Sequence, residues 1–106
     1  MSRIEAFEQM LARGQDSAML RFSLGREYIA QGDPATAIGH LEQAVVHDPD
    51  YSAAWKALGQ AHDHAGDPDA AIEAWNQGIR AAESRGDKQA VKEMRVFIRR
   101  AEKKRS

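Results

Sequence analysis

The chain has 106 residues, of which 42% are hydrophobic and 29% charged, and its formal net charge is −1 at pH 7. This composition is ordinary for one soluble globular domain and too apolar for an intrinsically disordered chain. Because there is no cysteine, disulfides and thiolate metal sites are excluded.

No apolar run approaches the roughly 18 residues that a membrane-spanning helix needs. The N-terminal stretch carries charges among its apolar residues and offers no small-residue cleavage site, unlike a secretory signal. A cytoplasmic location and no membrane contact are therefore expected. The charge is uneven: residues 87–106 carry eight basic and three acidic side chains, which is +5 and leaves −6 for the other 86 residues.

The first predicted helix covers residues 3–13, where apolar residues at spacings of three, three and one fall on one helical face. Gly14 ends this helix. Either Asp16 or Ser17 is expected to be the N-cap of the next helix.

Four further helices are predicted over about residues 18–31, 34–47, 52–65 and 68–84. A Gly-Asp-Pro turn joins the second helix to the third and the fourth to the fifth. In such a turn glycine ends one helix in the left-handed conformation, aspartate caps the next and proline takes its first position. A sixth helix over 87–104 places apolar residues inward and basic residues outward. No stretch shows strand-like alternation, so the fold class is all-α.

The stretch Leu24–Pro34 returns, altered, 34 residues later as Leu58–Pro68. A fixed period of this length indicates a repeat architecture. The glycines that recur at this period, Gly25 and Gly59, are expected to let the two helices of a hairpin approach closely. Ala37 and Ala71 are expected to be the small partners that face them, so a bulky residue at Gly59 should disrupt packing.

The repeated unit resembles the tetratricopeptide repeat (TPR) family, whose signature is W-x2-L-G-x2-Y followed by A-x3-F. The second unit matches this signature at Trp55, Leu58, Gly59 and Ala71, with His62 at the tyrosine position and Trp75 at the phenylalanine position. The resemblance implies two repeats, 18–51 and 52–85, with capping helices over 3–13 and 87–104. The chain looks like a small stand-alone bacterial protein of this family, a group without an established activity.

This resemblance implies an all-α, TPR-type helical hairpin array of about six helices, in which the first helix of each pair lines a concave groove. It also implies a non-catalytic protein–protein interaction scaffold that binds a peptide or a partner helix in that groove. The residues predicted to face the groove are Met19, Phe22, Arg26, Ile29, Lys56, Gln60, Asp63, Lys92 and Arg99.

Two alternatives stay open. Two repeats are fewer than the roughly three that usually make a stable array, so the chain could assemble with itself, for example as a homodimer. The basic C-terminal helix could instead contact an acidic protein segment; nucleic acid is the less favoured partner because no aromatic residues are interleaved with the cations. No catalytic group, metal site or cofactor site stands out.

Overall fold

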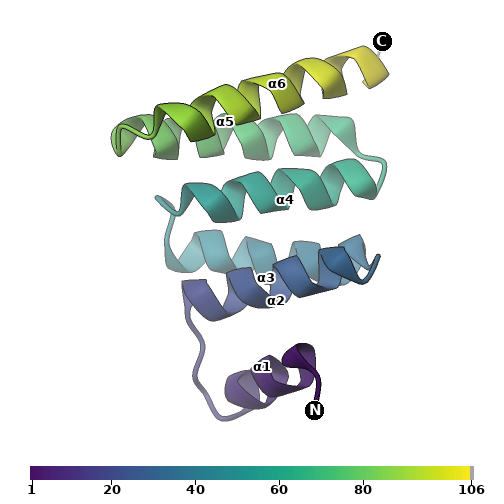
Figure 1. Ribbon diagram of the computed structural model, residues 1–106, viewed down its shortest axis with the longest axis vertical. Coiled ribbons are helices and arrows are strands. Elements are labelled where there is room, and N and C mark those ends of the chain that lie inside the picture. The colour runs from purple at the N-terminus through teal and green to yellow at the C-terminus, as the bar shows by residue number, and fades with distance from the viewer. Residues whose placement is uncertain (106) are drawn as a thin grey trace.

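The computed structural model describes residues 1–105 as six α-helices, with no strand in that part of the chain. This confirms the all-α prediction. The helices are α1 (Arg3–Ala12), α2 (Ala18–Ala30), α3 (Pro34–His47), α4 (Ser52–His64), α5 (Pro68–Ser84) and α6 (Lys88–Arg105). They stack along an axis of 42 Å, with α2, α4 and α6 in one layer and α3 and α5 in the layer behind (Figure 1). The stack ends in α1 on one side and α6 on the other.

Three of the five turns share one design. In each, a glycine with φ between +71° and +84° precedes an aspartate whose carboxylate accepts a hydrogen bond from the backbone N–H three residues later. Glycine suits this position because a side chain disfavours positive φ. The three pairs are Gly32–Asp33, Gly66–Asp67 and Gly86–Asp87. The third turn lacks the proline, and since its aspartate is the cap, α6 begins at Lys88.

Three helical glycines each receive a large side chain from the next helix. The pairs are Gly25–Leu41, Gly59–Trp75 and Gly78–Met94, with the large residue 16 positions after the glycine each time. The side chains nearest to Gly25 and Gly59 are therefore Leu41 and Trp75 rather than the expected alanines. Ala37 and Ala71 are buried in the core, but leucine and tryptophan occupy the space beside the glycines.

The contact of Gly78 with Met94 packs α5 and α6 against each other as closely as the two helices of each repeat. The sixth helix is attached by the same Gly-Asp turn and the same glycine-to-large contact as the second helix of each repeat. The core accordingly forms two clusters, one centred on α3 and α4 and the other on α5 and α6. Trp75 connects α5 to α4, because its indole N–H donates to the Lys56 carbonyl at 3.1 Å.

At the other end of the stack, α1 contains no fully buried residue and its Met10 is exposed. Polar contacts add to its apolar packing. Glu8 accepts a hydrogen bond from the Tyr28 hydroxyl at 3.1 Å and lies 3.5 Å from Nε2 of His40. Arg21, at the position that Trp55 has in the second repeat, donates to Asp16 at 2.8 and 2.9 Å.

The contact with Arg21 also determines which ring nitrogen of His40 carries the proton. Nη1 of Arg21 lies 3.2 Å from Nδ1 of the imidazole, and because a guanidinium can only donate, Nδ1 is the acceptor. The single ring proton of the neutral imidazole is then on Nε2, which faces Glu8. Burial lowers the pKa of His40 and favours this neutral form.

The Asp16 carboxylate predicts a measurable dependence of stability on pH. The hydrogen bonds from Arg21 lower the pKa of Asp16 to about 2. A lowered carboxyl pKa stabilises the folded state above the unfolded pKa of about 4, and this contribution is lost as the pH falls towards 2. Since solvent screens a carboxylate that is about a third exposed, we expect Asp16→Asn to lower the free energy of unfolding by only about 1 kcal/mol at pH 7.

The measurement is urea denaturation of wild type and Asp16→Asn from pH 7 down to pH 2. The difference between the two proteins should be constant above about pH 5 and shrink steadily below about pH 4. A difference that persists unchanged at pH 2 would show that the asparagine acts through packing rather than through charge.

Candidate partner-binding groove

Three cavities follow one another along the face formed by α2, α4 and α6. The central one, of about 260 Å³, lies between α2 and α4. It shares Phe22 and Arg26 with a cavity of about 470 Å³ beside α1, and Gln60 with a cavity of about 210 Å³ beside α6. Because neighbouring cavities share walls, together they form one groove, which we call the inner groove.

The central cavity has an aromatic wall and a cationic rim. The Phe22 ring packs against Tyr51, with 5.0 Å between the ring centroids, and the guanidinium of Arg26 lies 5.7 Å from the Phe22 centroid. A cation over an aromatic face is attracted to the ring. Ala53 and Ala57 keep the α4 side shallow, and Lys56 stands between them.

Ion pairs hold the edges of the groove. Lys56 of α4 pairs with Glu93 of α6 at 3.1 Å, and Asp63 of α4 pairs with Lys104 of α6 at 3.1 Å. These two contacts join the helices that line the groove. Within residues 1–105, Arg26 is a groove cation with no carboxylate at ion-pair distance, and so it can accept one from a ligand.

Five of the nine predicted groove residues line the inner groove. Phe22, Arg26, Lys56 and Gln60 come together in the central cavity, although two stand on α2 and two on α4. Asp63 lines the cavity beside α6, where it is paired.

The other four predicted residues lie elsewhere. Met19 is 71% exposed and lines none of the three cavities, while Ile29 packs against the core cluster around α3 and α4. Lys92 lines a different cavity, between α5 and α6, and Arg99 is exposed on α6. The side chains by which α6 lines the groove are instead Phe97, Arg100 and Lys104, and Glu93 pairs with Lys56 at its edge.

Sequence reasoning missed these α6 residues and also Phe7, which lines the cavity beside α1. Phe97, Arg100 and Lys104 are spaced three and four apart, and such residues share one face of a helix. That spacing is visible in the sequence, but it does not reveal which face of α6 turns towards α4.

The groove offers surface for non-covalent binding of a ligand. Aromatic and aliphatic surface alternates with guanidinium and ammonium groups, which suits an extended segment with an apolar anchor and a carboxylate. In residues 1–105 no three His, Asp or Glu side chains gather as metal ligands would. None of the helices in this part of the chain is long and apolar enough to cross a membrane.

Comparison with known proteins identifies the family. A model described as tetratricopeptide repeat matches residues 22–87. The TPR repeat-containing protein PA0015 of Pseudomonas aeruginosa is 50% identical over 103 residues, which cover 97% of this chain and 98% of that protein.

Solved structures show the same fold. Protein BPP2914 from Bordetella parapertussis is 44% identical with a TM-score of 0.84, over 98% of this chain and 90% of that one. The Sgt2 TPR domain from Aspergillus fumigatus is 31% identical with a TM-score of 0.81, over 95% of this chain and 64% of that one.

Proposed function

The chain belongs to the tetratricopeptide repeat family, whose members generally mediate protein–protein interaction without catalysis, and from this premise we propose a function. The chain is a non-catalytic scaffold that holds an extended peptide or a partner helix in the inner groove. It has no enzymatic activity of its own.

The observation that carries the proposal is the continuity of the inner groove from α1 to α6. Three neighbouring cavities that share lining residues offer room for a segment longer than a single side chain, as peptide recognition requires. The aromatic wall at Phe22 suits an apolar anchor of the ligand, and Arg26 suits a carboxylate beside it. The ligand therefore carries a leucine or aromatic side chain next to an acidic one.

Self-assembly is the weaker candidate. The self-assembly hypothesis was based on the observation that two repeats alone make a short array. Since α6 packs on α5 with the same glycine-to-large register and covers the second repeat, the array from α2 to α6 has five helices, one short of the roughly three helix pairs that stability usually requires. The inner groove does not need a second copy to be complete.

Peptides selected from a random library against the immobilised protein test the groove. We expect selected peptides to bind wild type and to lose at least about tenfold in affinity for Ala53→Arg, because the arginine fills the central cavity from its exposed α4 wall. Affinities would be measured by fluorescence anisotropy, and the contact surface would be mapped by amide chemical shifts.

The matched control is Val46→Arg, an equally long substitution at a residue of α3 that is 71% exposed and lines none of the three cavities. It should leave affinity unchanged. If Ala53→Arg binds every selected peptide as wild type does, or if the shifts fall on α3 and α5, the groove is not the binding site.

A further inference from the structure

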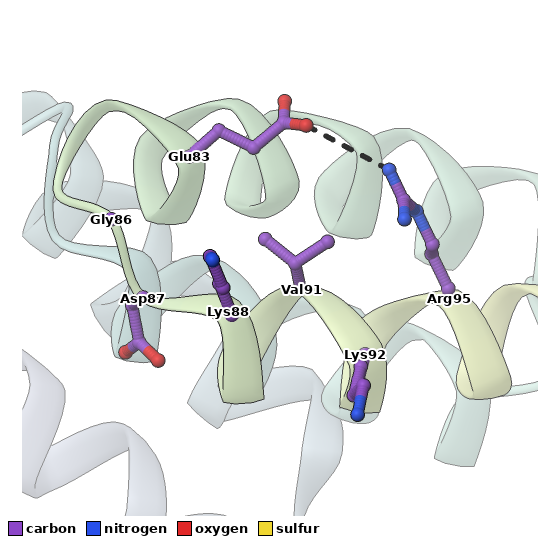
Figure 2. A pocket seen from close by; sticks show the side chains of 7 residues that line it. All are labelled: Glu83, Gly86, Asp87, Lys88, Val91, Lys92 and Arg95. Carbon is purple, nitrogen blue, oxygen red and sulfur yellow. Dashed lines mark ion pairs between the residues drawn. The ribbon is translucent and has the colours of Figure 1, made fainter.

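A second surface lies at the end of the stack, outside the inner groove. Between the C-terminal turn of α5 and the first half of α6 is a cavity of about 410 Å³ (Figure 2), which we call the end cleft. Val91 supplies its apolar floor and is itself buried. Its other lining residues are Glu83, Gly86, Asp87, Lys88, Lys92 and Arg95.

The acidic side chains of the end cleft are already occupied. Glu83 pairs across the cleft with Arg95 at 3.7 Å, as Figure 2 shows. Asp87 caps α6 by accepting from the Ala90 backbone N–H at 3.1 Å. Neither carboxylate neutralises the two lysines of the cleft.

Lys88 and Lys92 therefore remain available. Within residues 1–105, neither has a carboxylate at ion-pair distance. They are four residues apart, so they stand about 6 Å apart along one face of α6, and Arg95 and Arg99 continue the same face at the next turns. The apolar floor at Val91 and the two lysines without an ion-pair partner therefore lie together at the exposed end of the stack.

We propose that the end cleft binds an acidic helical segment of a partner protein, separately from the inner groove. Two carboxylates one turn apart on that segment pair with Lys88 and Lys92, and an apolar side chain between them covers Val91. The cleft has ample volume for a leucine side chain. Charge complementarity supports this partner because the cations lie at the same one-turn spacing that carboxylates have on a helix.

A nucleic acid fits less well. No aromatic side chain lines the cleft for stacking on bases.

The test uses a fluorescein-labelled peptide of about 16 residues that repeats Glu-Leu-Ala-Ala, so that glutamates recur every four residues, one turn apart. We expect wild type to bind it and to bind neither its Glu→Gln version nor its Leu→Ser version. Anisotropy titration against Lys88→Glu/Lys92→Glu should show affinity weaker by at least about tenfold. This variant should fold normally, since both lysines are exposed and a glutamate in the first turn favours a helix.

The matched control is Arg13→Glu/Arg80→Glu, which changes the net charge equally at exposed residues outside both sites. It should bind the peptide almost as wild type does. Equal loss in both double variants, or no binding of the glutamate peptide by wild type, would overturn the proposal. Tighter binding of a DNA duplex than of the peptide would also overturn it, in favour of a nucleic-acid surface. The inner-groove variant Ala53→Arg should retain this peptide, so the two sites are tested independently.

Discussion

Gly59→Ala is expected to lower the free energy of unfolding by about 2 kcal/mol, although alanine is the better helix former. A methyl group at this position would overlap the indole of Trp75, which is only 2% exposed. The indole cannot move aside cheaply, because its N–H donates to the Lys56 carbonyl and would be left buried without a partner. The overlap therefore outweighs the gain in helix propensity.

Gly39→Ala is the matched control, since the same substitution inside α3 meets no atom within 4 Å. There only helix propensity changes, and we expect stabilisation by about 1 kcal/mol. Urea denaturation followed by circular dichroism measures both variants. If the two substitutions shift stability in the same direction, close approach of α4 and α5 is not the reason for Gly59.

The repeats themselves were predictable because their signals are local. A Gly-Asp-Pro turn marks where one helix ends and the next begins. Its glycine adopts positive φ, its aspartate caps the next helix and its proline takes the first helical position. The period of 34 residues then indicates that consecutive hairpins stack alike. The resemblance to the tetratricopeptide family further implied that Phe22, Arg26, Lys56 and Gln60 face one groove, and all four line one cavity.

The placement of α6 was not predictable in the same way, because it lies beyond the second repeat. Lys92 and Arg99 of this helix were predicted from the sequence to face the groove, and neither lines it. The orientation of α6 about its own axis is set by Met94, which packs against Gly78. In this orientation Glu93 faces Lys56.

The contacts of α1 could not be predicted from the sequence for another reason. Glu8 and His40 are distant in sequence, and nothing local indicates that they meet. The one available signal was Arg21, a charged residue at a position where the second repeat has Trp55. A charge at a packing position indicates that polar partners come from elsewhere in the chain, here Asp16 and His40.

Met94→Ala is expected to have the largest effect on stability, a loss of about 3 kcal/mol. Met94 is fully buried between α6 and α5, in the same cluster as Trp75. Because Trp75 in turn is hydrogen-bonded to α4, a cavity beside Gly78 weakens contacts that reach beyond the last hairpin. The whole stack should therefore unfold in one transition with a lower midpoint.

Met94→Leu is the control, since it nearly conserves volume and should cost less than about 1.5 kcal/mol. Circular dichroism at 222 nm and Trp fluorescence would be followed in the same urea titration, because the tryptophans Trp55 and Trp75 lie in α4 and α5 rather than in α6. Coincident shifts of both signals for Met94→Ala would show that α6 is an integral part of the stack. If helicity were lost early while the fluorescence midpoint stayed at its wild-type value, α6 would be a detachable cap, and the end cleft that it forms with α5 would open independently of the repeats.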